Sequence, residues 1–251
     1  MENAIVVLKD KSLNSYVKKV NKFFNVLDVV LINEKTNKKG DIYICFGGDG
    51  TFLWTANLAK SKPVIGFNFG NLGFLSNFEF KDIDKVLRKI KEGKILPEKR
   101  SRIKILKHQV LNDIIINSQD GSLVTFDITI NNLKSIKFKG NGIIFSTSTG
   151  STAANAYAGG PIVVPTLHCI IINAIVPYSF FVKPIVVDID SKIVLKVHFD
   201  KKEPIIIIDG RFIGKVKKYS SLKIEKGDDA YVFSSSDVFY NISKKLRKIV
   251  F

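Results

Sequence analysis

The sequence has few of the residues that build metal centres and disulfide scaffolds. Its 251 residues include two cysteines and three histidines, and the histidines show no metal-ligand spacing. Cys45 and Cys169 each lie inside an apolar run, which predicts two buried free thiols and a reducing, cytoplasmic location. No run of about 18 apolar residues occurs, and no basic segment precedes the first apolar stretch. We therefore expect no transmembrane helix, no membrane partner and no signal peptide.

Arginine is also scarce, although the chain is strongly basic. The formal net charge is +16, from 39 lysines and arginines against 23 acidic residues. The arginines are Arg88, Arg100, Arg102, Arg211 and Arg247. Arginine is the usual side chain for reading guanine, and the lysines are spread along the whole chain. We predict a solvated lysine-rich surface that attracts small anions such as nucleotides, and no nucleic-acid partner.

The first part of the chain alternates short apolar runs with helical spacing. Strands are predicted over residues 4–8, 29–32, 42–46 and 64–67, and helices near 17–24, 51–59 and 83–90. Strand and helix in alternation imply βαβ units. Residues 1–97 are therefore predicted to form an α/β domain with a mostly parallel sheet.

The second part changes to a period of two. Residues 124–130 and 193–199 alternate apolar and polar side chains, which is typical of strands with one buried face. We predict an all-β sandwich or closed sheet over residues 98–235. Residues 237–248 begin with the potential N-cap Asp237 and end in basic residues, which predicts a final helix in the tail 236–251.

One polar cluster interrupts the predicted parallel sheet. In the stretch "ICFGGDGTFL", Ile44 to Leu53, a buried strand gives way to glycines, an aspartate and then a helix. Open parallel sheets bind ligands at such a point, and glycines let the backbone approach a phosphate. The stretch is neither a Walker loop nor the dinucleotide fingerprint. Asp49 could simply cap the helix, but a cap does not explain three flanking glycines, so we favour a phosphate site.

Three further clusters are ambiguous when taken singly. They are "GFNFGNLGFLSNF" (Gly66 to Phe78), "VLNDIII" (Val110 to Ile116) and "KGNGIIFSTSTGSTAANAYAGGPIV" (Lys139 to Val163). Each could be an ordinary loop, turn or packing segment. Asn112 and Asp113, however, stand among branched apolar residues, where a polar pair needs a ligand or an internal partner.

In combination, the four clusters resemble the NAD kinase family. The GGDGT signature is shared with lipid kinases of the diacylglycerol and sphingosine type, but the order and spacing of the full set are more specific. The set comprises Gly47–Thr51, Gly66–Leu75, Asn112-Asp113, "TGSTA" (Thr149 to Ala153) and "GGPIV" (Gly159 to Val163), and "INAIVPYSFFVKPIVV" (Ile172 to Val187) and "IDGRFIG" (Ile208 to Gly214) continue it. The resemblance covers nearly the whole chain. It implies an α/β domain, a β-sandwich domain and a C-terminal tail that returns to the first domain.

The resemblance also assigns roles. The family transfers a phosphoryl group to the 2′-hydroxyl of the adenosine ribose of NAD, giving NADP. Asp49 matches the base that faces this hydroxyl, and Gly47, Gly48, Gly50 and Thr51 match the phosphate cradle. The positions that match NAD-binding residues are Asn112, Asp113, Lys139, Asn141, Thr149, Thr152, Ala153, Ala154, Tyr157 and Asp209. ATP or polyphosphate would be the donor, with Mg2+ or another divalent metal brought by the donor, and the family is usually a homodimer or homotetramer.

Several positions depart from the family pattern. Asn141 replaces a usual aspartate, Ser148 a proline and Ala154 a tyrosine. The lost ring removes a stacking surface worth about 1–3 kcal/mol by analogy with base stacking. Tyr157 could substitute for it if the segment is helical, and Trp54 stands where many members carry a basic residue.

Two other function classes stay open at this point. A lipid kinase would share the glycine loop, but "LGFL" and "TGSTA" argue against it, and no strongly amphipathic membrane-facing stretch is present. A non-enzymatic sensor would bind NAD or NADP without turnover, and the changes at Asn141 and Ala154 make it conceivable.

Overall fold

The computed structural model describes residues 1–69, 73–133, 135–200, 202–218, 220–234 and 243, and it divides the chain into two compact units. The first unit holds Met1–Lys99 and the described residues from Ala230 onward, and the second holds Arg100–Asp229. The sequence placed the domain ends at residues 97 and 235. The structure places the second crossing earlier because Ala230–Val232 pairs with a strand of the first unit. Apart from Ser243, the predicted tail 236–251 and its helix lie outside the described residues.

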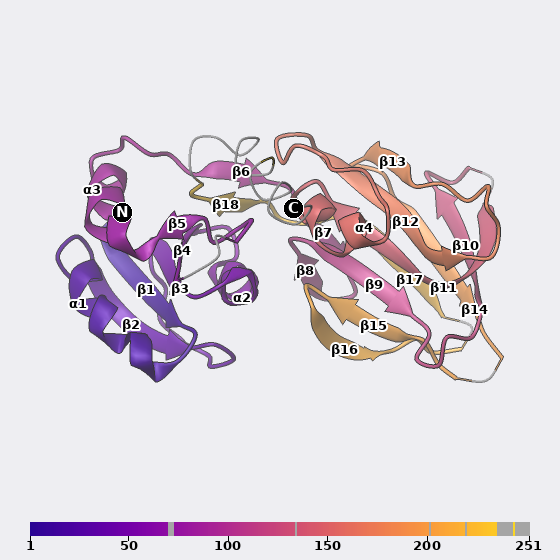
Figure 1. Ribbon diagram of the computed structural model, residues 1–251, viewed down its shortest axis with the longest axis horizontal. Coiled ribbons are helices and arrows are strands. Elements are labelled where there is room, and N and C mark those ends of the chain that lie inside the picture. The colour runs from indigo at the N-terminus through magenta and orange to yellow at the C-terminus, as the bar shows by residue number, and fades with distance from the viewer. Residues whose placement is uncertain (70–72, 134, 201, 219, 235–242, 244–251) are drawn as a thin grey trace. The chain divides into compact units, whose positions relative to one another are not determined.

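The first unit is built on a mostly parallel sheet, as predicted (Figure 1). Across the sheet the strands are β2 (Asn25–Leu31), β1 (Asn3–Leu8), β3 (Ile42–Phe46), β4 (Pro63–Asn68), β18 (Ala230–Val232) and β6 (Glu98–Arg100), and β5 (Phe78–Glu79) also pairs with β4. The pairs β1–β2, β1–β3, β3–β4, β4–β5 and β4–β18 are parallel. The central strands are buried on both faces, which is why their sequences read as continuous apolar runs.

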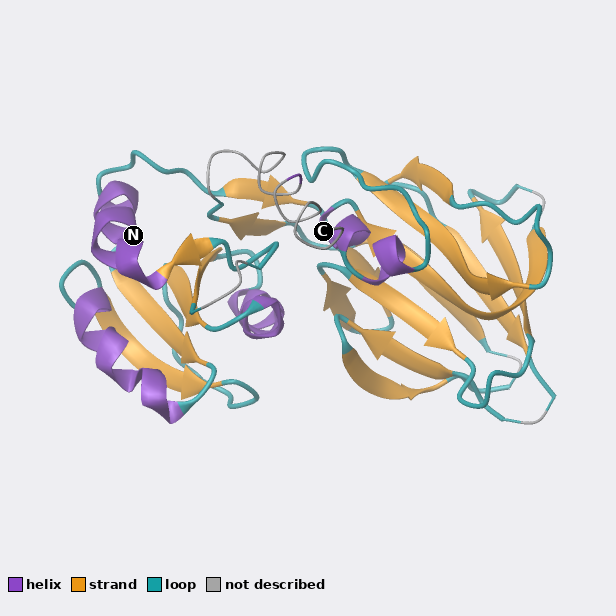
Figure 2. Ribbon diagram, viewed as in Figure 1, coloured by secondary structure: helices purple, strands orange, loops and turns teal. Residues whose placement is uncertain are grey.

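Helices cover both faces of this sheet (Figure 2). They are η1 (Lys11–Tyr16), α1 (Val17–Val20), α2 (Asp49–Ala59), η2 (Phe80–Asp82) and α3 (Ile83–Lys91). The apolar side of α3, including Ile83 and Leu87, packs in one core with Val6 of β1, while α2 lies on the opposite face. The helix expected near residues 17–24 is shorter: α1 covers only Val17–Val20, a 3-10 segment precedes it, and a turn follows from Asn21. Asn14 and Asn21 favour turns over helix interiors, which accounts for the difference.

The second unit is one eleven-stranded antiparallel sheet. Its main path runs β16 (Arg211–Lys215), β15 (Ile205–Ile208), β9 (Asp113–Asn117), β11 (Ile136–Thr147), β10 (Val124–Ile130), β14 (Ile193–His198), β17 (Ser221–Lys226), β7 (Ile103–Ile105) and β8 (His108–Val110), with β12 (Cys169–Pro177) paired to β11 and β13 (Ile185–Asp188) paired to β12. Side chains from nine of these strands form one core, so the sheet curls around a single apolar interior. The two layers expected of a sandwich are thus parts of one continuous sheet.

Two short helices, η3 (Thr149–Thr152) and α4 (Ala154–Tyr157), follow β11 in the second unit. Among the described residues, no helix is long and apolar enough to cross a membrane.

Candidate active site

The glycine loop lies where ligands bind in parallel sheets. Residues 47–48 follow β3 directly, and α2 begins at Asp49. The chain passes from β1 to its neighbour β2 on one side, whereas β3 and β4 lie on the other side of β1. Such a switch in strand order opens a crevice at the carboxyl ends of the strands. The loop therefore occupies the position that the sequence predicted for an anion site.

Asp49 does not cap α2. The N-cap is Gly48, and no side-chain capping bond is made there. Instead, Oδ2 of Asp49 accepts the backbone N–H of Phe74 at 2.8 Å, and Oδ1 accepts those of Leu75 and Ser76 at 3.0 and 2.9 Å. The capping alternative is therefore wrong. The carboxylate is held by a backbone segment 25–27 residues further along the chain.

That segment has a close fit around the carboxylate. A Cβ atom on Gly73 would lie 1.9 Å from Oδ1 of Asp49, so only glycine fits there. Ser76 donates its hydroxyl to the carbonyl oxygen of Gly47 at 2.8 Å, which fastens the segment to the glycine loop. Sequence reasoning assigned no role to Gly73 or Ser76. The signal was present in the "LGFLS" pattern, but its partner could not be read from local spacing.

The glycines of the loop differ in what they contact. A Cβ on Gly47 would lie 2.4 Å from Oγ1 of Thr51, so packing requires this glycine. A Cβ on Gly48 or Gly50 would meet nothing within 4 Å, and neither residue has positive φ. Neither packing nor backbone strain explains these two glycines. What they do leave is bare backbone at the N-terminus of an eleven-residue helix, which is a favourable place for a phosphate.

In the second unit, Asp209 holds the Asn112-Asp113 turn in place. Its carboxylate accepts the backbone N–H groups of Leu111, Asn112 and Asp113 at 3.1, 2.8 and 3.3 Å. Asp209 has φ 48° and Gly210 has φ 75°, as the tight hairpin turn between β15 and β16 requires. The Asp209 carboxylate, which is buried, therefore positions the turn by binding the backbone of residues 111–113.

Asp113 has a strongly perturbed carboxyl group. Burial, together with the negative charge of Asp209, raises the pKa of Asp113 to about 7, and a backbone N–H from Ala154 opposes the rise. Burial also raises the pKa of Asp209, against its three amide bonds. Two neighbouring buried carboxyls with raised pKa values are typical of functional sites.

The "TGSTA" segment packs directly against this turn. The Thr147 amide donates to the Asn112 carbonyl at 2.9 Å, and a Cβ on Gly150 would lie 2.1 Å from the same carbonyl oxygen. Among the described residues, Oδ1 of Asn112 and Oγ1 of Thr149 are buried without a hydrogen-bond partner. Orphaned buried polar atoms are uncommon, and here two occur in adjoining segments. They are the side-chain atoms that a ligand at this turn would satisfy.

The rest of the helical segment is more open. Thr152 and Ala153 are half-buried at the end of η3, and Ala154 begins α4. Tyr157 is in the helix, as its suggested stacking role required, but its side chain is 86% exposed. No described aromatic ring pairs with it.

Lys139 and Asn141 lie elsewhere on the sheet. Thr147 lies six positions after Asn141 on β11, which corresponds to roughly 20 Å along an extended strand. The Asn141 amide donates to the carbonyls of Gly121 and Ser122. The structure therefore does not bring these two residues together with Asn112 and Thr149.

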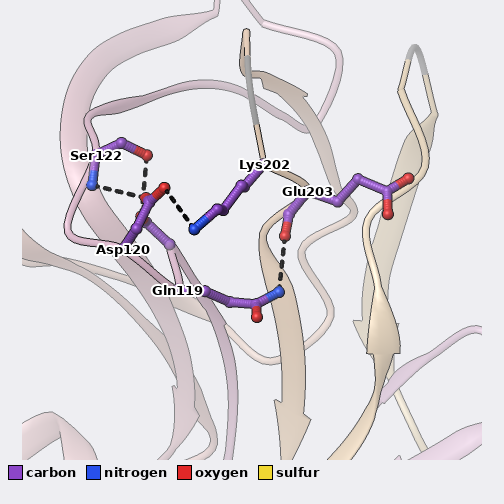
Figure 3. A network of polar contacts seen from close by, with 6 residues as sticks. Gln119, Asp120, Ser122, Lys202 and Glu203 are labelled. Atoms are coloured by element: carbon purple, nitrogen blue, oxygen red, sulfur yellow. Dashed lines mark hydrogen bonds and ion pairs between the residues drawn. The ribbon is translucent and has the colours of Figure 1, made fainter.

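The turn that Asn141 contacts forms its own polar network (Figure 3). Asp120 accepts the backbone N–H of Ser122 at 3.1 Å and pairs with Lys202 at 3.6 Å. The Ser122 bonds lower the pKa of Asp120. Gln119 donates to the Glu203 carbonyl at 3.2 Å, so this turn is tied to the segment before β15.

Comparison with known proteins gives a consistent answer over both units. Residues 7–95 match the ATP-NAD kinase N-terminal domain model, and residues 111–235 match the ATP-NAD kinase C-terminal domain model. An NAD kinase from Clostridium perfringens strain 13 is 30% identical over 261 residues, which cover 96% of this chain and 95% of the relative. A bifunctional NADP phosphatase/NAD kinase from Methanocaldococcus jannaschii is 34% identical over 210 residues, covering 79% of this chain and 36% of that protein.

Solved structures agree. An NAD kinase from Archaeoglobus fulgidus in complex with ATP superposes with a TM-score of 0.84 at 27% identity, and covers 98% of both chains. A yeast NADH kinase complexed with NADH gives a TM-score of 0.86 at 20% identity over 98% of this chain and 87% of that one, which supports the fold. The chain belongs to the NAD kinase family.

Proposed function

We propose that the protein is an NAD kinase that moves a phosphoryl group from ATP or polyphosphate to the 2′-hydroxyl of the adenosine ribose of NAD. The observation that carries the proposal is the carboxylate of Asp49, fixed by three backbone amides beside two glycines whose missing side chains leave open space. The two domain matches add to it and disfavour a lipid kinase.

The chemistry assigned to the first unit is positioning and proton acceptance. The N–H groups around Gly48 and Gly50 orient the donor phosphates, and Thr51 lines the loop. As the 2′-oxygen forms its bond to phosphorus, the bond from phosphorus to the donor oxygen breaks, and the hydroxyl proton passes to Asp49. Oδ2 of Asp49 accepts one backbone N–H, which leaves a lone pair for that proton. A loose transition state allows the proton to leave late, so a weak base suffices.

The second unit supplies the NAD side. Asn112, Asp113 and Thr149 bind the ribose and adenine, which is supported by the orphaned oxygens of Asn112 and Thr149. Asp209 positions their backbone. For Lys139, Asn141, Thr152, Ala153, Ala154 and Tyr157 the support is the family resemblance alone.

A divalent ion such as Mg2+, brought by the donor, would supply neutralisation of the charge that develops on the donor phosphates. Among the described residues, no group of three or more His, Cys, Asp or Glu could hold a metal ion. Isothermal titration tests this separately from turnover. Free Mg2+ alone should give no saturable heat, whereas MgATP should bind more tightly than ATP in EDTA.

Assembly and location are part of the proposal. We place the enzyme in the cytoplasm as a homodimer or homotetramer. The two free, buried cysteines support a reducing compartment. Light scattering of the purified protein and fractionation of the source cells test these two assignments.

The deciding experiment measures NADP formation from NAD with Mg2+, in parallel with ATP and with polyphosphate. Product with either donor supports the proposal, and the ratio identifies the donor. Absence of product in a sample that still binds NAD would favour the non-enzymatic sensor. Phosphorylation of diacylglycerol in anionic vesicles, without NADP formation, would favour the lipid kinase.

A further inference from the structure

The hairpin that follows Asp209 carries a half-buried arginine, Arg211, at the start of β16. Its Nε atom is buried and has no hydrogen-bond partner among the described residues. In the same part of the chain its guanidinium forms no ion pair. A buried donor without an acceptor is costly and uncommon. The Nε–H of Arg211 therefore indicates a partner from outside the chain.

The pairing of β16 directs Arg211 toward the interior of the curled sheet. Arg211 stands opposite Ile208 on β15, and the side chains of paired residues lie on the same face. Ile208 belongs to the buried core, whereas the next residue on β16, Phe212, is 64% exposed. Ile213 then packs against the core with an apolar side chain. Packing alone would be served by an apolar residue at position 211 as well.

Two further nitrogen-bearing side chains lie close to Arg211. The strands β16 and β8 are the two ends of the sheet's main path, yet the charge of Arg211 reaches His108 on β8 (Figure 1). Burial lowers the pKa of His108, and the positive charges of Lys107 and Arg211 lower it further. Lys107 is exposed in the turn between β7 and β8 and forms no ion pair with any residue that the structure describes. The two ends of the sheet therefore meet in a basic cluster.

One carboxylate lies near this cluster, but it is directed elsewhere. Asp209 accepts the backbone N–H groups of residues 111–113. Burial raises the pKa of Asp209, while these amide bonds and the charge of Arg211 lower it. No ion pair joins Asp209 to Arg211, both of which lie in the described part of the chain. Asp209 thus fixes the hairpin beside the Asn112 turn and leaves the guanidinium for another anion.

We propose that Arg211, with Lys107 and His108 beside it, binds a phosphate group. The guanidinium fork and an imidazole N–H are donors that suit phosphate oxygens. The favoured source is a phosphate of the dinucleotide, because Asp209 ties this hairpin to the turn of Asn112. Free inorganic phosphate has the same chemistry and is the second source. The first source rests on the proposed function, whereas the second does not.

Isothermal titration of the purified full chain with NAD, adenosine and inorganic phosphate, at constant ionic strength, tests the site without turnover. Adenosine contains the adenine and ribose of NAD but no phosphate. We expect Arg211→Gln to weaken NAD binding about tenfold or more and to change adenosine binding by less than about twofold. Arg211→Lys keeps the charge without the fork, so its NAD affinity should fall in between. The matched control is Arg88→Gln on the exposed side of α3, which should change neither.

Free phosphate as the occupant would give a different pattern. It would bind saturably at one site per chain, also in the presence of saturating NAD. Arg211→Gln would then abolish phosphate binding and leave NAD binding unchanged. A wild type that binds phosphate through Arg211 but does not bind NAD would keep this site and reject the proposed function.

Three results would overturn the proposal. The first is unchanged binding of both NAD and phosphate in Arg211→Gln, and the second is a wild type that binds neither. The third is an equal loss of adenosine and NAD binding, since the arginine would then only support the fold. Circular dichroism checks folding, and if Arg211→Gln does not fold, Lys107→Ala in the exposed turn takes its place. It should weaken NAD or phosphate binding about threefold with adenosine unchanged, and no effect would equally reject the site.

Discussion

At the scale of single residues, Asp49 has two roles, and a substitution of Asp49 affects both at once. Its carboxylate anchors the backbone of Phe74, Leu75 and Ser76, and it is also the proposed base. Asp49→Asn places an amide donor against a backbone donor. We expect kcat to fall at least about 100-fold, as when a general base is lost. The free energy of unfolding should fall by about 1–3 kcal/mol, as steady-state kinetics and urea unfolding will show.

The control for this prediction loosens the same segment without touching the carboxylate. Ser76→Ala removes the hydroxyl bond to the Gly47 carbonyl and should cost about 1 kcal/mol of stability while keeping most of the turnover. If Ser76→Ala loses activity to the same extent as Asp49→Asn at a similar loss of stability, Asp49 acts as an anchor and not as the base.

Asp113 should make stability depend on pH. Its folded pKa of about 7 lies above the ordinary value near 3.8, so the folded protein keeps the proton that the unfolded chain has already lost. Its contribution to stability is therefore present at low pH and is lost as pH rises through about 7. Asp113→Asn removes this titration. In urea unfolding at pH 5 and pH 8, wild type should lose more stability between the two than the variant, and an equal loss in both would contradict the assignment.

At the scale of the element, the glycines between β3 and α2 lower the stability of the helix but leave room for the donor phosphates. Gly50 lies in the first turn of α2, where a Cβ would meet nothing within 4 Å. Because alanine favours helix over glycine by up to about 1 kcal/mol, Gly50→Ala should raise the free energy of unfolding. The same methyl group should impede the donor phosphates and raise the KM for the donor.

Gly73→Ala provides the opposite case. Its Cβ would meet Oδ1 of Asp49, so both stability and activity should fall. Thermal unfolding and donor kinetics of the two variants test the contrast. A Gly50→Ala protein that is more stable and equally active would show that no phosphate approaches there.

Elements fixed by local pattern could be predicted, whereas their distant partners could not. The strand over 42–46 was predicted with the bounds that it has, because a continuous apolar run between turn signals is a strong local signal. The partners of Asp49 lie 25–27 residues away and are backbone amides, which no side-chain pattern reveals. In the same way, period two indicates strands but not register, so the sequence predicted an all-β sandwich or closed sheet without saying which strands pair.

At the scale of the whole molecule, the chain crosses between its two units twice. One crossing follows Lys99 and the other precedes Ala230. The side chain of Arg102 is buried in the second unit, near the start and the end of that unit in the chain. Arg102 donates to the carbonyls of Asp228 and Asp229 at 2.5 and 3.4 Å, and its own carbonyl accepts the Gly227 amide at 2.8 Å. One arginine therefore ties the entering and leaving strands of the second unit together.

Arg102→Met keeps the bulk of the side chain but leaves those two carbonyls without their donor, so we expect the second unit to lose about 2–5 kcal/mol. The chain offers a built-in probe, because its single tryptophan, Trp54, lies on α2 in the first unit. In urea, the circular dichroism transition of the variant should move to lower denaturant, while the Trp54 fluorescence transition stays near its wild-type midpoint. The exposed Arg88→Met on α3 should move neither. Equal shifts of both signals in Arg102→Met would mean that the two units unfold as one, and that the tie at the crossings stabilises the whole chain and not the second unit alone.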